Sequence, residues 1–132
     1  MARTFARIPE EVERLATQIL DGAFSVHRAL GPGLLEAVYH ACLCHEMRTM
    51  GIEHESEVSL PVVYRGITLD AGLRLDLWVQ RSVVVELKSV EKMIPVFDAQ
   101  LLTYLKLTGN RLGLLINFNV PVLKDGIKRM VL

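Results

Sequence analysis

The sequence has little of several features that would mark particular protein classes. Among its 132 residues it has only two cysteines, Cys42 and Cys44, so a disulfide framework is not expected. Its 15 lysines and arginines balance 15 aspartates and glutamates, so the formal net charge is zero. The whole-chain field is therefore not basic, and a nucleic-acid partner would have to be held by a local patch or by a metal ion.

Long apolar runs and biased segments are also missing. No run approaches the ~20 apolar residues that a membrane span needs, so no membrane partner is expected. Residues 1–16 lack the apolar stretch of a secretion signal, and we therefore expect a cytoplasmic protein. Hydrophobic residues are plentiful, at 51% of the chain, and with no visible repeat or linker they predict a single domain over residues 1–132.

Hydrophobic periodicity predicts an α/β or α+β domain built on a mixed sheet, with the element order α-α-β-β-β-α-β-β. Two helices are expected on either side of the Gly31-Pro32-Gly33 break, and a third between Pro95 and Gly109. Pro61 would place the first strand at a sheet edge or a bulge. The expected strands cover residues 57–66, 67–79, 82–90, 111–118 and 125–132.

One expected strand, VVVELKSV at residues 83–90, carries an acid and a base within an apolar run. Because side chains alternate along a strand, Glu86 and Lys88 share one face. Taken alone, this pattern fits an ordinary half-exposed strand with a surface ion pair. However, Asp76 lies in the preceding apolar strand, and an unpaired buried charge is costly. Together the three residues favour a functional site.

Asp76 and Glu86 could share one divalent cation if the hairpin brings them together. Mg²⁺ prefers a few carboxylates plus water and phosphate oxygens, and Mn²⁺ is the alternative ion. A two-residue turn at Gln80-Arg81 would place Asp76 opposite Val85 and turn it away from Glu86. We therefore predict a three-residue connection, a bulge or an equivalent offset that places Asp76 near Glu86 or Val84.

Three motifs in order resemble those of a known superfamily. Asp76 followed by Glu86-Leu87-Lys88 resembles the PD-(D/E)xK nuclease signature, with Leu75 in place of the proline. Gln100-Leu-Leu-Thr-Tyr104 resembles the QxxxY motif of RecB-like members. Gly33-Leu-Leu-Glu36-Ala-Val-Tyr39 resembles the motif of the GxxExxY proteins, a small-domain branch. The resemblance spans nearly the whole chain and implies a restriction-endonuclease-like core.

The resemblance also implies a role for each matched residue. Asp76 and Glu86 would be metal ligands, with the carbonyl oxygen of Leu87 as a third. Lys88 would be the catalytic lysine, which stabilises charge on a phosphate or helps to activate water. Glu36 would be an additional acid that binds the metal directly or through water.

Four further residues are candidates for support of the site or for substrate binding. Gln100 and Tyr104 share one helix face and, by resemblance, support the site and the nucleic-acid end; the alternative is the polar edge of a core helix. Tyr39 would hold Glu36 by packing or a hydrogen bond. His27 could reach the site, although a lone helical histidine is more often a satisfied structural residue.

The leading hypothesis is a Mg²⁺-dependent nuclease that hydrolyses DNA phosphodiester bonds. The alternative is a non-cleaving module that keeps the nuclease fold and binds a protein or a nucleic-acid end, since fold and motif do not determine function. A third interpretation, a hydrolase of small phosphorylated molecules, would require a deep pocket. A homo-oligomer is also expected, because it would supply the ~1,000 Å² of protein surface that specific duplex binding needs.

Overall fold

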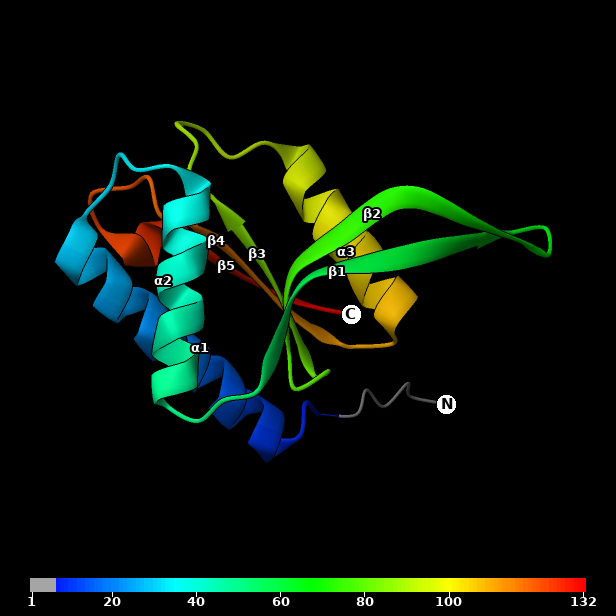
Figure 1. Cartoon of the computed structure of the whole chain (residues 1–132), viewed down its shortest axis with the longest axis horizontal. Coiled ribbons are helices and arrows are strands. Elements are labelled where there is room, and N and C mark those ends of the chain that lie inside the picture. The colour runs from blue at the N-terminus through cyan, green and yellow to red at the C-terminus, as the bar shows by residue number, and fades with distance from the viewer. Residues whose placement is uncertain (1–6) are drawn as a thin grey trace, which may run out of the picture.

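The computed structural model describes residues 7–132 (Figure 1). Residues 1–6, which belong to the segment predicted to lack a secretion signal, lie outside the described residues. Within the described chain, three α-helices and five strands follow the predicted order. They are α1 (Glu10–Leu30), α2 (Glu36–Thr49), β1 (His54–Tyr64), β2 (Ile67–Val79), β3 (Val83–Lys88), α3 (Pro95–Thr108), β4 (Leu112–Asn117) and β5 (Ile127–Val131). A short 3-10 helix, η1 (Leu123–Gly126), precedes β5.

The strands form one mixed sheet in the order β1-β2-β3-β4-β5. Neighbouring strands are antiparallel except for β3 and β4, which are parallel and are connected through α3. The predicted mixed-sheet class and element order are therefore confirmed. β1 is an edge strand, and its register shifts beside Pro61, between Leu60 and Val62, so both expectations for this proline are met.

Local sequence explains where the helices begin and end. The first turn of α1 carries three glutamates, which suit the positive end of the helix dipole. The helix ends at Leu30, where Gly31 takes a φ of 67°. α3 begins at Pro95, whose missing N–H has no helical partner at that position in any case, and it ends at Gly109 in the left-handed region.

Helices cover both faces of the sheet, with α1 and α2 on one side and α3 on the other (Figure 1). Val83, Val85 and Leu87 of β3 pack in the cluster that contains α1 and α2. Val84 packs in a second cluster with Leu101 and other residues of α3. We call these the α1/α2 cluster and the α3 cluster. Burial on both faces explains why β3 reads as an apolar run rather than an alternating one.

The first two strands change sheet face partway along their length. Leu75 of β2 packs in the α3 cluster, but Leu77 packs in the α1/α2 cluster. Residues two apart in a regular strand share a face, so β2 is irregular between them. The β1–β2 pairing skips the Glu57–Asp76 position, and Glu57 has a φ of 51°. The backbone irregularity therefore lies at Asp76, one of the predicted site residues.

Candidate active site

The connection between β2 and β3 places Asp76 opposite Glu86. The connection has three residues, 80–82, and the antiparallel register pairs Leu77 with Val85. The regular pairing ends there, and hydrogen bonds from the N–H of Asp76 to the Glu86 carboxylate and from the N–H of Leu87 to the Asp76 carboxylate set Asp76 beside Glu86. The predicted three-residue connection is therefore confirmed, and with it the side-by-side arrangement that a shared cation demands.

The backbone pairing of β2 with β3 ends at Leu77, and the next hydrogen bonds between the two strands are accepted by the Asp76 and Glu86 carboxylates. The N–H of Asp76 donates to Oε1 of Glu86 at 3.1 Å. The N–H of Leu87 donates to Oδ2 of Asp76 at 2.8 Å. Each carboxylate uses one oxygen in this exchange, which leaves its other oxygen outside these two bonds. The two carboxylates thus hold β2 and β3 together at the end away from the connecting loop, and the Leu87 N–H takes part in one of the two bonds.

Burial makes the Glu86 carboxylate difficult to ionise. Only 7% of the residue is exposed, and loss of hydration, followed by the charge of Asp76, raises its pKa to about 9. The Asp76 backbone hydrogen bond and the charge of Lys88 oppose this shift. Two adjacent carboxylates cannot both ionise at low cost without a compensating charge. A proton or a divalent cation can supply it, and a pair of carboxylates beside a peptide carbonyl is a donor set that Mg²⁺ accepts.

Glu36 is the first residue of α2 and is exposed. Partial desolvation, followed by the charge of Asp76, raises its pKa, while Lys88 and His40 oppose the shift. Glu36 thus lies within electrostatic reach of the site. Over residues 7–132, however, no three His, Cys, Asp or Glu side chains form a group that could hold a metal ion. Direct ligation by Glu36 together with both other acids is therefore not supported, and contact through water remains a prediction.

Lys88 is the last residue of β3 and is half-buried. Its Nζ lies 4.4 Å from the centroid of the Phe97 ring, in the first turns of α3. A cation over an aromatic face is attracted by the ring quadrupole. The carbonyl of Lys88 accepts a hydrogen bond from the N–H of Phe118 at 2.9 Å, which anchors the strand end. Both the backbone and the ammonium group of Lys88 are thus held in place.

α3 brings Tyr104 to the acids and leaves Gln100 exposed. Tyr104 is buried in the α3 cluster, and burial, followed by the charges of Glu86 and Asp76, raises the pKa of its hydroxyl. A backbone hydrogen bond with Arg74, two residues before Asp76, opposes this shift. Tyr104 is therefore close to the predicted ligands, as a supporting role requires. Gln100 lies one helical turn earlier, where its exposed side chain remains available to a partner.

Tyr39 holds the loop before α2 instead of Glu36. It is fully buried and stacks on Phe118, with ring centroids 4.5 Å apart. Its hydroxyl donates to the carbonyl of Gly31 at 2.6 Å and accepts from the N–H of Leu34 at 3.1 Å. A tyrosine has one hydrogen to donate, so the expected donation to Glu36 is not made. Tyr39 positions Glu36 only indirectly, by fixing the turn from which α2 begins.

His27 has a structural hydrogen bond. It is buried near the end of α1, and its Nε2 pairs with the carbonyl of Val120 at 2.8 Å. This contact joins α1 to the segment that follows β4. This bond fits the structural alternative, a satisfied core histidine, and support of the site by His27 stays a prediction.

The sequence pattern did not single out Asn117 or Phe97. Asn117 ends β4, is 2% exposed, and donates through Nδ2 to the carbonyl of Val90 at 3.0 Å. Its Oδ1 accepts from the N–H groups of Val90 and Asn119 at 3.1 and 3.2 Å. Asn117 thereby fixes the segment directly after Lys88. The available signal was a polar residue at the end of an otherwise apolar buried strand.

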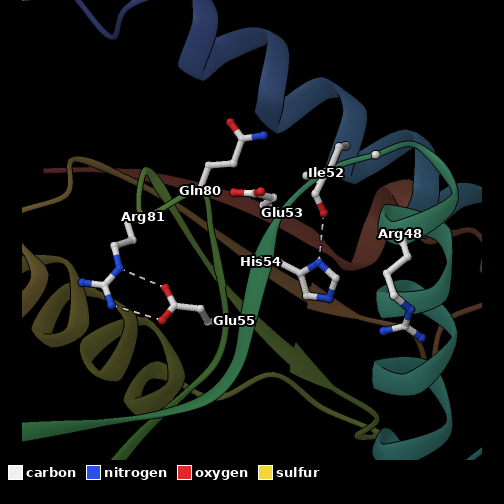
Figure 2. A pocket seen from close by; sticks show the side chains of 8 residues that line it. Arg48, Ile52, Glu53, His54, Glu55, Gln80 and Arg81 are labelled. Carbon is white, nitrogen blue, oxygen red and sulfur yellow. Dashed lines mark hydrogen bonds and ion pairs between the residues drawn. The ribbon is translucent and has the colours of Figure 1, made fainter.

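A hollow of about 930 Å³ lies at the opposite end of β3 from Lys88 (Figure 2). Its lining residues are Arg48, Gly51, Ile52, Glu53, His54, Glu55, Gln80 and Arg81. Arg81 and Glu55 form a two-pronged ion pair there, at 3.0 and 3.1 Å. None of the predicted site acids lines this hollow. It therefore does not provide the deep pocket at the acids that a hydrolase of small phosphorylated molecules would require.

Helices cover both faces of a mixed sheet, and Asp76 of β2 lies beside Glu86 and near Lys88 of β3, which together form a nuclease-like core. Family comparison agrees, because the model of the PD-(D/E)XK nuclease superfamily matches residues 13–130. The chain belongs to this superfamily of nucleases. No curated protein and no solved structure matches the chain significantly. None of the helices described here is long and apolar enough to cross a membrane.

Proposed function

We propose that the protein is a single-domain, metal-dependent nuclease that hydrolyses DNA phosphodiester bonds. Its active site would lie where Asp76 of β2 meets the end of β3. The observation that carries the proposal is a pair of hydrogen bonds beside Lys88: the Glu86 carboxylate accepts from the N–H of Asp76, and the Asp76 carboxylate accepts from the N–H of Leu87. Ordinary strand pairs do not place a half-buried carboxylate next to a buried one, because their repulsion and the desolvation are costly. A catalytic metal ion would offset the repulsion of the two carboxylates and so account for this arrangement.

Asp76 and Glu86 would hold Mg²⁺ or Mn²⁺, with the Leu87 carbonyl as a third ligand and Glu36 in contact through water. When bound, such an ion neutralises charge on the phosphate and lowers the pKa of a bound water. The interstrand hydrogen bonds of the two carboxylates pre-organise the acids. Pre-organised ligands need little rearrangement during the reaction.

Lys88 would stabilise the negative charge that develops on the phosphate as water attacks phosphorus. Its ammonium group retains three N–H donors over the Phe97 ring, so it can donate to a phosphate oxygen. Tyr104 would support the acids from the α3 side, and the exposed Gln100 would contact the nucleic-acid end. These two roles belong to the proposed assignment to the RecB-like and GxxExxY branches.

The test is cleavage of labelled single- and double-stranded DNA with Mg²⁺, with Mn²⁺ and with EDTA. Lys88→Ala is expected to lower the rate by about 10²-fold or more, a typical loss for one electrostatic catalytic group. Glu86→Ala removes a proposed metal ligand and is expected to abolish metal-dependent cleavage. Lys106→Ala, an exposed lysine in the last turn of α3, is the matched control and should cleave like the wild type. Cleavage that persists in both site variants would refute the assignment.

A non-cleaving binding module is the second candidate. Two observations favour it: the acids do not form a group of three, and the formal net charge is zero. Such a module would bind a nucleic-acid end or a protein without cutting. Folded wild-type protein that binds DNA ends in Mg²⁺ and leaves them intact would support this candidate over the nuclease.

A further inference from the structure

Asn117 is a buried polar residue that the proposed chemistry does not use. It is the last residue of β4, it is only 2% exposed, and it pairs with Lys88 in the parallel register of β3 and β4. All other residues of β4 are leucine, isoleucine or glycine. A buried amide is costly unless its donor and acceptor groups are hydrogen-bonded. The bonds of Asn117 therefore indicate why a polar side chain stands at this position.

The side chain of Asn117 extends the pairing of β3 beyond its last residue. Where β3 ends, the N–H of Phe118 donates to the carbonyl of Lys88 at 2.9 Å. Two residues further on, Nδ2 of Asn117 donates to the carbonyl of Val90 at 3.0 Å, and Oδ1 accepts from the N–H of Val90 at 3.1 Å. The amide thus binds both backbone groups of one residue, as two directly paired residues do in an antiparallel ladder. We call these two bonds the Asn117–Val90 clamp.

A third bond fixes the orientation of the amide. Its Oδ1 also accepts from the N–H of Asn119 at 3.2 Å. With the amide reversed, its NH₂ group would face two N–H donors, so only this orientation satisfies all the groups around it. An aspartate of the same size would lose the donor to Val90, and an alanine would lose the donor and the acceptor.

Val90 lies in the chain between Lys88 and the aromatic ring that its ammonium group contacts. Residues 89–94 connect β3 to α3, and this connection runs over the top of the view in Figure 1. In the first turn of α3, the Phe97 ring lies 4.4 Å from Nζ of Lys88, measured to the ring centroid. The hydroxyl of Ser89 also donates to the carbonyl of Leu34, at 2.5 Å. Lys88 is therefore followed by two anchored residues, and the clamp fixes the start of the connection that brings back Phe97.

We propose that Asn117 is a positioning residue for Lys88. The clamp holds the end of β3 so that the ammonium group stays over the Phe97 ring, from where it can reach the phosphate. The catalytic part of this inference rests on the proposed nuclease function, whereas the placement of Lys88 does not. Among residues 7–132, the three bonds of the Asn117 side chain reach neither of the two acids. Asn117 therefore acts through Lys88 and leaves the proposed metal ligands as they are.

The flexibility of lysine gives the clamp its importance. A lysine carries a point charge on a four-carbon stem, so the position of the charge depends on where the backbone is held and on what the stem contacts. A catalytic group that is displaced by ~1 Å can cost about 10²-fold in rate. If Asn117 only satisfied the backbone of its own loop, its loss would lower stability and leave the surroundings of Lys88 unchanged.

NMR of the full chain with ¹³C-labelled lysine tests the placement without any need for nuclease activity. The ring current of Phe97 should shift the ε-methylene protons of Lys88; Lys88→Ala identifies this signal, and Phe97→Leu gives its unshifted position. Asn117→Ala is expected to lose most of the shift. Asn117→Asp keeps the size of the side chain but not the donor to Val90, and it should lose part of the shift. Asn119→Ala keeps its N–H, is the matched control and should retain the shift in full.

Cleavage kinetics test the catalytic consequence. Asn117→Ala is expected to lower kcat about tenfold or more, while KM and the calorimetric affinity for Mn²⁺ stay near the wild-type values. Asn119→Ala should match the wild type in all three. A general loosening of the fold would weaken the metal site together with kcat, so the separation of the two distinguishes positioning from a structural role.

Three results would overturn the proposal. They are a full ring-current shift in folded Asn117→Ala, equal losses of kcat and Mn²⁺ affinity, and rapid hydrogen exchange of the Val90 N–H in the wild type, which requires no variant. Circular dichroism shows whether the variants are folded. A wild type that does not cleave DNA would refute the nuclease function, and loss of the Lys88 shift in Asn117→Ala would still support the placement.

Discussion

Replacing Glu86 by glutamine is expected to stabilise the metal-free protein at neutral and alkaline pH. Burial and the charge of Asp76 raise the pKa of Glu86 from 4.5 to about 9 in the folded state. The folded protein therefore binds this proton more tightly than the unfolded chain does. Its contribution to stability is full below about pH 4.5, and it is lost as the pH rises towards 9.

The size of the effect follows from the same two values. A pH of 7 is 2.5 units above the pKa of 4.5 that the carboxyl has in the unfolded chain. At ~1.4 kcal/mol per unit, this difference corresponds to ~3 kcal/mol of lost stability. The charge is shared with Asp76, so we expect about 1–3 kcal/mol. Glutamine keeps the size of the side chain and the oxygen that accepts the N–H of Asp76, and it has no charge to bury.

Urea unfolding in EDTA between about pH 5 and pH 9 measures this effect. The stability of the wild type should fall across this range, and that of Glu86→Gln should fall less. Glu91→Gln, the same change on the exposed segment after β3, should follow the wild type. Added Mg²⁺ should stabilise the wild type at high pH, by about 2.7 kcal/mol at roughly 100 times its dissociation constant, and Glu86→Gln less. Equal pH slopes for wild type and Glu86→Gln would refute the reasoning.

Substitutions at three further positions test contacts of the fold and of the site. Phe97→Leu should lower kcat/KM several-fold, because a cation–π contact contributes ~0.5–1 kcal/mol or more, while Phe97→Tyr keeps the ring and should retain the rate. Tyr39→Phe removes the hydrogen bonds to the loop before α2 and should lower the free energy of unfolding by about 1–2 kcal/mol in denaturant titrations; no change would show that stacking on Phe118 is sufficient. Gly126→Ala would place a Cβ 2.1 Å from the carbonyl oxygen of Asn117, so we expect a loss of about 3 kcal/mol or more, measured by thermal unfolding; a variant as stable as the wild type would contradict this close approach.

The order of the elements could be predicted because it depends on local patterns. Helical spacing, proline and glycine at the ends of α3, and the continuous apolar run of β3 are properties of short segments. The pairing of Asp76 with Glu86 could also be anticipated, because alternation along two strands allows only certain loop lengths. The sequence by itself therefore determined the mixed sheet class and the order of the elements, whereas it placed Asp76 beside Glu86 only through the condition that the two acids share a cation.

Other features depend on contacts between residues far apart in the chain, and only the tertiary structure decided them. The ring of Phe97 over Lys88, the bond of His27 to Val120 and the use of the Tyr39 hydroxyl on the loop before α2 are contacts of this kind. The same holds for the change of sheet face at Asp76 and for the Asn117–Val90 clamp. A periodic pattern states which side of an element is apolar, but it does not state what packs against that side. That depends on how the layers meet in three dimensions.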